Sequence, residues 1–163
     1  EDAIRALKGE QKKIEIEPEI TMKIASFFPV SYLPDVGERV QLYRRLSSVE
    51  GHESISELET EIRDRFGPLP DEVNNLLGLM TIKLYLKHLH VVRMSCGPKR
   101  TSLQFAESTP ASPQKLVALI SSKPKEYQMT PDQKFVFAVA DTGWQAQLRE
   151  IQRLCEYLEV PVP

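Results

Sequence analysis

The sequence predicts an α+β domain that is rich in helices and has a small, mostly antiparallel sheet including a β-hairpin. The chain has 163 residues, enough for a single sizeable domain. Its strand-like stretches are few, and two of them flank Gly97-Pro98, which favours a hairpin and antiparallel pairing. The remaining apolar residues fall mainly into segments with helical periodicity. These observations favour α+β over a doubly wound parallel sheet.

The chain begins with a segment that is predicted to lead into the domain. Residues 1–13, EDAIRALKGEQKK, mix charges around a few apolar residues, so we expect the tail of a helix followed by a linker. The domain itself is expected over residues 14–163. A strand is predicted at about 19–25, because apolar residues there fall two apart. These residues are Ile20, Met22 and Ile24.

A helix is predicted over residues 36–47. Asp35 can accept a hydrogen bond from the backbone amide of Glu38 while the Glu38 side chain reaches back, which is a capping box. The predicted apolar side consists of Val36, Val40 and Tyr43, with Leu42 and Leu46 beside them. The edge carries Arg39, Arg44 and Arg45. A solvated rim is the simpler interpretation of these arginines.

The next predicted helix, over residues 54–66, carries two separate stripes. Its core side consists of Ile55, Leu58, Ile62 and Phe66. Glu57, Glu61 and Asp64 follow one another at i, i+4 and i+7 and share a line about a third of a turn away. Like charges at this spacing repel, at a cost of a few tenths of a kcal/mol per pair. The stripe is therefore either a solvated surface or one that faces a basic partner.

This helix is predicted to end in a firm corner within DRFGPLPDEV, residues 64–73. Gly67 can adopt the left-handed conformation that terminates a helix. Pro68 and Pro70 prevent the helix from continuing, and Pro70 suits the first turn of the next one. The chain is thus expected to fold back on itself here.

The rest of the chain adds a long central helix, the hairpin and three further elements. The helix at 70–90 has two apolar sides, which predicts a central position in the domain. VVRMSC and TSLQF form the hairpin, with Lys99 and Arg100 exposed near its tip. The further elements are a helix at 113–121, a strand at 134–140 and a closing helix at 142–158. Its buried line is predicted to be Trp144, Leu148, Ile151, Cys155 and Leu158.

The composition argues against several classes of function. A net charge of −2 does not suggest the strongly basic face of a dedicated nucleic-acid binder. No apolar run approaches the ~20 residues of a membrane-spanning helix. Cys96 and Cys155 are the only cysteines, and free cysteine commonly acts as a small hydrophobe. A reduced, cytosolic setting fits this usage.

The motifs of common catalytic and cofactor sites are absent from the sequence. There is no GxxxxGK[ST] or GxGxxG phosphate-binding loop and no GxSxG motif, so we expect no catalytic residues and no cofactor in this chain. His88 and His90 are two residues apart, but zinc needs about four ligands, so we interpret them as helix-end histidines rather than metal ligands. The acidic stripe has no accompanying nucleophile or glycine loop, which argues against catalysis.

Three motifs occur together in a specific order. They are YLPDVGERVQLYRRLSS, ELETEIRDRFGPLPDEVNNLL and, after a leucine-rich helix, VVRM. With these motifs the chain resembles the C-terminal (TRCF) domain of bacterial transcription-repair coupling factors, over about residues 14–140 and most strongly over 34–86. The segment EDAIRALKG is similar to the family's passage out of its motor domains. The part after about residue 140 matches less clearly and is expected only to pack.

The resemblance implies a role in transcription-coupled nucleotide excision repair in the bacterial cytoplasm. Proteins of this family recognise RNA polymerase stalled at DNA damage and push it forward with an ATP-driven double-stranded DNA translocase of helicase superfamily 2. They recruit the excision nuclease through UvrA. Their C-terminal domain is not the motor: it docks on a UvrB-like N-terminal module and covers the surface that UvrA would bind. The chain is then a non-catalytic, monomeric, autoinhibitory domain, and ATP and Mg belong to its parent protein.

The same resemblance names candidate contacts in the acidic stripe. Glu61 and Asp64 are carried over as interdomain contacts with a basic surface of the N-terminal module, and Glu57 is added from helical geometry alone. The main alternative is an accessory nucleic-acid-binding domain that uses the 97–100 turn and the arginines of helix 36–47. Salt-sensitive DNA binding would support that alternative. A third possibility, an unrecognised hydrolase, would require a concave site with perturbed acids.

Overall fold

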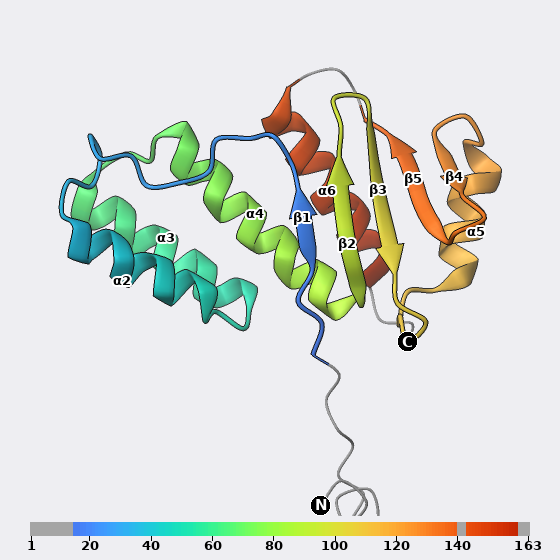
Figure 1. Cartoon of the computed structure of the whole chain (residues 1–163), viewed down its shortest axis with the longest axis horizontal. Coiled ribbons are helices and arrows are strands. Elements are labelled where there is room, and N and C mark those ends of the chain that lie inside the picture. The colour runs from blue at the N-terminus through green and yellow to red at the C-terminus, as the bar shows by residue number, and fades with distance from the viewer. Residues whose placement is uncertain (1–14, 140–142, 160–163) are drawn as a thin grey trace, which may run out of the picture.

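The computed structural model describes residues 15–139 and 143–159, and in this part of the chain five helices accompany one five-stranded sheet. The predicted α+β fold is confirmed. α6 lies against one face of the sheet, and α4 lies between the sheet and the pair formed by α2 and α3 (Figure 1). The predicted entry segment, residues 1–13, lies outside the described residues.

The sheet has the strand order β1-β2-β3-β5-β4, and only β1 and β2 pair in parallel. Its strands are β1 (Glu19–Thr21), β2 (Val91–Cys96), β3 (Arg100–Phe105), β4 (Tyr127–Met129) and β5 (Lys134–Ala138). The β2–β3 hairpin turns at Gly97-Pro98, as predicted. β1 is shorter than the predicted strand at 19–25, because only three of its residues pair with β2.

The helices are α2 (Val36–Ser47), α3 (His52–Phe66), α4 (Asp71–His88), α5 (Pro113–Ser122) and α6 (Trp144–Glu159). Their order and approximate bounds agree with the prediction. α3 begins two residues earlier than expected, after the N-cap residue Gly51. Pro70 is the N-cap of α4 rather than a member of its first turn. The Pro70 carbonyl accepts the first backbone hydrogen bonds of α4 from Val73 and Asn74.

α4 contributes to two separate hydrophobic cores, which confirms its predicted central position. Ile82 and Leu86 belong to the core between the sheet and α6, whereas Val73 and Leu77 belong to the core beneath α2 and α3. The sheet core also contains the predicted line of α6, with Leu148, Ile151, Cys155 and Leu158 buried and Trp144 partly buried against them. The α2–α3 pair is therefore joined to the sheet through one shared helix.

α2 buries a different side from the predicted one. Leu42 and Leu46 are the buried residues of this helix, whereas Val36, Val40 and Tyr43 are exposed. The physical reason is that Leu42 and Leu46 share the core beneath α2 and α3 with residues of α3 and α4. The Val36 side of α2 lies outside that core.

The predicted capping box of α2 is formed only in part. The Asp35 carboxylate accepts from the Glu38 backbone amide at 2.8 Å, as expected. The Glu38 carboxylate, however, accepts from the guanidinium of Arg65 on α3 instead of reaching back to Asp35. The ion pair between Glu38 on α2 and Arg65 on α3 thus replaces the local hydrogen bond that the capping box would have formed.

The corner after α3 is present, but its conformation differs from the predicted one. Gly67 has φ 93° and ψ −168°, so its φ is positive while its ψ is extended rather than helical. Its amide donates to the Arg63 carbonyl at 2.9 Å, and its carbonyl accepts from the Tyr32 hydroxyl at 2.8 Å. Pro68 and Pro70 then lead directly into α4. The corner is held both by α3 and by the loop that precedes α2.

Candidate functional site

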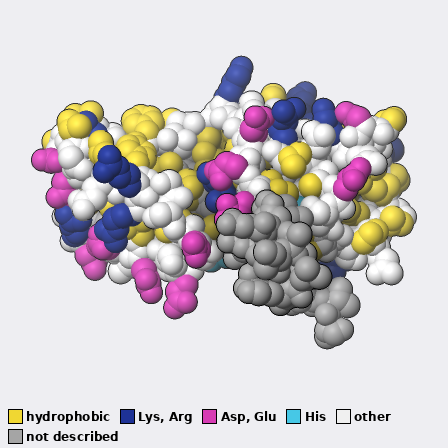
Figure 2. Space-filling view, turned by 60° about the horizontal axis from the view of Figure 1, so that its bottom comes forward, with side chains coloured by type: hydrophobic (Ala, Val, Ile, Leu, Met, Phe, Trp, Pro, Cys, Tyr) yellow, Lys and Arg dark blue, Asp and Glu magenta, His cyan; other side chains and the backbone are white. Residues whose placement is uncertain are grey.

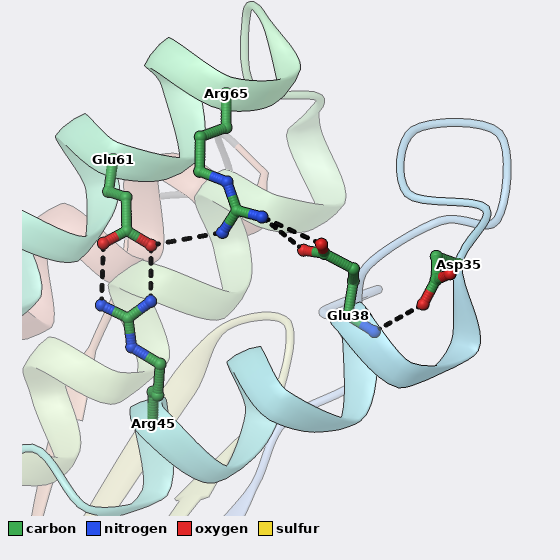
Figure 3. A network of polar contacts seen from close by, with 5 residues as sticks. All are labelled: Asp35, Glu38, Arg45, Glu61 and Arg65. Carbon is green, nitrogen blue, oxygen red and sulfur yellow. Dashed lines mark hydrogen bonds and ion pairs between the residues drawn. The ribbon is translucent and has the colours of Figure 1, made fainter.

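Glu61 of the predicted acidic stripe lies at the centre of a network of charged side chains between α2 and α3 (Figure 3). Arg45 donates to both of its carboxylate oxygens, at 2.5 and 2.9 Å. Arg65 lies 3.5 Å from Glu61 through one nitrogen and donates to Glu38 at 2.7 Å through another. The order Glu38, Arg65, Glu61, Arg45 therefore alternates in charge across the two helices.

The network changes the protonation chemistry of Glu61. The hydrogen bonds from Arg45 are the largest cause, and together with the charges of Arg45 and Arg65 they hold the pKa of Glu61 below its ordinary value of 4.5. The hydrogen bonds to Glu61 and the negative charge of Glu61 in turn raise the pKa of Arg45. All four side chains are more than a third exposed, so solvent screens the pairs and their contribution to stability is modest.

We expect Glu61→Gln to lower the free energy of unfolding by roughly 0.5–1 kcal/mol at pH 7. A carboxyl group whose pKa is lower in the folded state contributes its stability above the unfolded pKa and loses it as the pH falls through the folded pKa. The difference from the wild type should therefore vanish in the acidic range below the pKa of Glu61. Urea unfolding at a series of pH values measures it. Glu57→Gln is the matched control, and a gap for Glu61→Gln that stays constant with pH would contradict the assignment.

Glu57 and Asp64 flank Glu61 on α3 but differ from it in their surroundings. Both are exposed, and neither forms an ion pair with any residue in 15–139 or 143–159. Glu57 lines a hollow of about 220 Å³ together with Arg45 and Glu61. The predicted stripe is thus a central carboxylate neutralised by two arginines, with a free carboxylate on each side. Its use as an interface stays a prediction.

Sequence reasoning missed the partners of Glu61. Arg45 was assigned to a solvated rim, whereas it makes the bidentate contact that joins α2 to α3. Each helix carried a partial indication of this contact. Glu38 and Arg45 are seven residues apart and Glu61 and Arg65 are four apart, so each pair lies on one side of its own helix. Nothing in the sequence showed that these two lines face each other.

The cysteines and histidines have structural environments. Burial raises the pKa of Cys96 to about 11 and that of Cys155 to about 12, so both are predominantly protonated thiols at neutral pH. His88 contacts Glu159, and His90 contacts Ser108. Within residues 15–139 and 143–159, no three His, Cys, Asp or Glu side chains are grouped as a metal site would require. None of the described helices is long and apolar enough to span a membrane.

The basic residues of the alternative prediction do not come together. Lys99 and Arg100 lie at the β2–β3 turn, which is remote from α2 (Figure 1). On α2, the Arg39 guanidinium donates to the carbonyls of Leu33 and Pro34, and Arg45 is paired with Glu61. The arrangement therefore offers no single basic surface for nucleic acid that joins these two regions.

The chain is similar to known proteins over most of its length. The family model described as "TRCF domain" matches residues 22–116. The chain is 32% identical over 140 residues to the transcription-repair-coupling factor of Haemophilus influenzae, covering 83% of this chain and 12% of that protein. It is 28% identical to those of Myxococcus xanthus and Escherichia coli, covering 83% and 79% of this chain and 11% and 12% of those proteins. This chain thus spans about an eighth of the length of these relatives.

A solved structure has the same fold. The crystal structure of the C-terminal domain of a transcription-repair coupling factor superposes with a TM-score of 0.75 and 23% sequence identity. The superposition covers 90% of this chain and 94% of the solved chain.

Proposed function

This chain belongs to the TRCF domain family of transcription-repair-coupling factors, and from that premise we propose that it is a regulatory docking domain of such a factor and not its motor. In this proposal the α2–α3 surface packs against a UvrB-like N-terminal module of the same polypeptide. The packed domain covers the surface that UvrA would bind, which holds the factor in a repressed state. DNA translocation, ATP hydrolysis with Mg, the contact with RNA polymerase and the cytoplasmic location belong to the parent protein in this proposal.

One observation carries the proposal: α3 presents two free carboxylates beside a fixed, charged network. Glu57 and Asp64 have no ion-pair partner among the described residues, so their charges are available to a basic surface. Glu61 lies between them, and its orientation is fixed by Arg45 and Arg65. A carboxylate that is held in place loses less side-chain entropy on binding than a free one. The acidic group of contacts is thus partly pre-organised.

The helical scaffold also suits an interface. Ile55, Leu58 and Ile62 are buried on the side of α3 that lies about a third of a turn from the acidic stripe, and the Gly67 corner ties the end of α3 to Tyr32 and α4. Interfaces on rigid elements keep their geometry better than interfaces on loops. An exposed, ordered and charged helix face is what a docking surface for a basic module requires.

We expect charge reversal of the two free carboxylates to release the proposed docking. Glu57→Lys/Asp64→Lys in the full-length coupling factor should weaken docking by about 1–3 kcal/mol, because like charges would face the basic module. UvrA capture should then rise by about 5-fold to 150-fold. Pull-down of UvrA by the wild-type and variant factors measures this effect. The variant leaves the Arg45–Glu61 pair in place, so the fold of the domain should be retained.

A second charge reversal controls for total charge. Glu15 and Glu107 are exposed carboxylates without an ion-pair partner in the described part of the chain, and neither belongs to α3. Glu15→Lys/Glu107→Lys should leave UvrA capture unchanged. Equal capture by all three proteins, with equal melting curves, would refute the masking role of this surface.

A further inference from the structure

Exposed apolar side chains gather on the side of α2 that the sequence predicted to be buried. Nine large hydrophobic residues of the described chain are exposed, and five of them lie between positions 27 and 43. Phe27 and Val30 belong to the loop before α2. The other three, Val36, Val40 and Tyr43, lie on α2 and form what we call the α2 outer face. Val36 is 64% exposed and Val40 is 43% exposed. Such a concentration on a folded surface is typical of an interaction site.

The α2 outer face is separate from the network that contains Glu61. Val36, Val40 and Tyr43 are spaced i, i+4 and i+7, so they share one side of the helix. Glu38 and Arg45 point to α3 from roughly the opposite side, where they bind Arg65 and Glu61. A partner on the outer face would therefore not occupy the surface proposed above to dock the N-terminal module.

The loop before α2 is fixed against the helix at this face. The Phe28 amide donates to the Tyr43 hydroxyl at 2.8 Å, and the two rings meet edge to face at 5.0 Å. Arg39 donates to the carbonyls of Leu33 and Pro34, which ties the end of the loop to the helix. The apolar residues are thus held in place before any partner binds, which lowers the entropic cost of binding.

The charged residues of α2 that lie beside the outer face are both arginines. Arg39 and Arg44 flank the line of Val36, Val40 and Tyr43 on its two sides. Arg44 forms no ion pair with residues 15–139 or 143–159, and Glu38, the acidic residue of α2, is occupied by Arg65. At the α2–α3 end of the molecule, at the left of Figure 2, hydrophobic, basic and acidic side chains are interspersed.

We propose that the α2 outer face binds an amphipathic helix whose apolar stripe is flanked by carboxylates. The apolar stripe of the partner would cover Val36, Val40 and Tyr43, and its carboxylates would pair with Arg44 and Arg39. A helix fits because the exposed residues form a straight line along α2 with helical spacing, which matches the anchors of a second helix. Charge complementarity selects an acidic partner over a basic one. This interaction is independent of the proposed docking of the N-terminal module.

The test uses the 163-residue chain and two synthetic helical peptides that share leucines at i, i+4 and i+7. One peptide carries glutamates beside the leucines, and the other carries lysines at the same positions. Fluorescence anisotropy of the labelled peptides measures binding. The acidic peptide should bind at least about tenfold more tightly than the basic one. Equal binding of both peptides, or binding of neither, would overturn the proposal.

Variants locate the binding site. Val40→Asp should weaken binding of the acidic peptide by about tenfold or more, because it places a carboxylate in the apolar line. Arg44→Glu should weaken binding of the acidic peptide and strengthen binding of the basic peptide. Val117→Asp is the matched control, since Val117 on α5 is 60% exposed but lies outside the α2 outer face. The same loss in Val117→Asp as in Val40→Asp would also overturn the proposal, and circular dichroism verifies that each variant is folded.

Discussion

Replacing Gly67 by valine is expected to lower the free energy of unfolding by about 2–3 kcal/mol. With φ 93° and ψ −168°, Gly67 occupies a region of backbone space that is essentially restricted to glycine. A Cβ built at this position would meet no atom within 4 Å, so the expected cost comes from backbone strain and not from a steric clash with neighbours. The Gly67 carbonyl also accepts a hydrogen bond from the Tyr32 hydroxyl. A backbone shift that relieved the strain would therefore break this hydrogen bond. Chemical denaturation of the isolated chain measures the loss.

Gly51→Val is the matched control for this prediction. Gly51 precedes α3 with φ −148° and ψ 158°, which is extended backbone that any residue adopts, and a Cβ there would also meet nothing within 4 Å. Its replacement should cost no more than about 1 kcal/mol, from the poorer N-cap preference of valine. Similar losses at the two glycines would show that the corner has no special conformational requirement.

The elements that depend on local chemistry could be predicted from the sequence. The two apolar sides of α4 indicated a central helix, and the helix indeed contributes to both cores. The turn at Gly97-Pro98 between two short apolar stretches indicated the hairpin. Each of these signals lies within about 20 residues, where periodicity and turn chemistry determine the outcome.

The features that depend on distant residues could not be predicted in the same way. Arg45 and Glu61 are 16 residues apart, and Glu38 and Arg65 are 27 apart, so no local pattern shows that they pair. α2 has apolar residues on two sides, and only its packing against α3 and α4 decides that Leu42 and Leu46 are buried. β4 is a three-residue edge strand that pairs with β5, which is too short to give a reliable alternation.

The arrangement of the two cores leads to a prediction about cooperativity. α4 supplies Val73 and Leu77 to the core beneath α2 and α3, and Ile82 and Leu86 to the core beneath the sheet. A break in either core therefore removes support from the same helix. We expect the described domain to unfold in one transition, although its two cores are distinct.

Ile62→Ala tests this expectation with a large perturbation. Ile62 on α3 is completely buried in the core beneath α2 and α3, so its truncation should cost about 2–5 kcal/mol. Trp144, the only tryptophan of the chain, packs on the other core and reports on it by fluorescence. In Ile62→Ala, tryptophan fluorescence and far-ultraviolet circular dichroism should both shift to lower denaturant concentration by the same amount.

Val117→Ala provides the reference for a truncation at the surface, because Val117 is 60% exposed and should change stability by no more than about 0.5 kcal/mol. If Ile62→Ala shifts the dichroism signal while the fluorescence of Trp144 keeps its wild-type midpoint, the two cores unfold separately. The α2–α3 pair could then detach from the sheet without unfolding it, and its charged surface would no longer have the firm base on which the proposed docking depends. If the midpoints of both signals shift by the same amount, the two cores unfold together. The sheet core then also stabilises the positions of Glu57, Glu61 and Asp64, because α4 connects that core to α3.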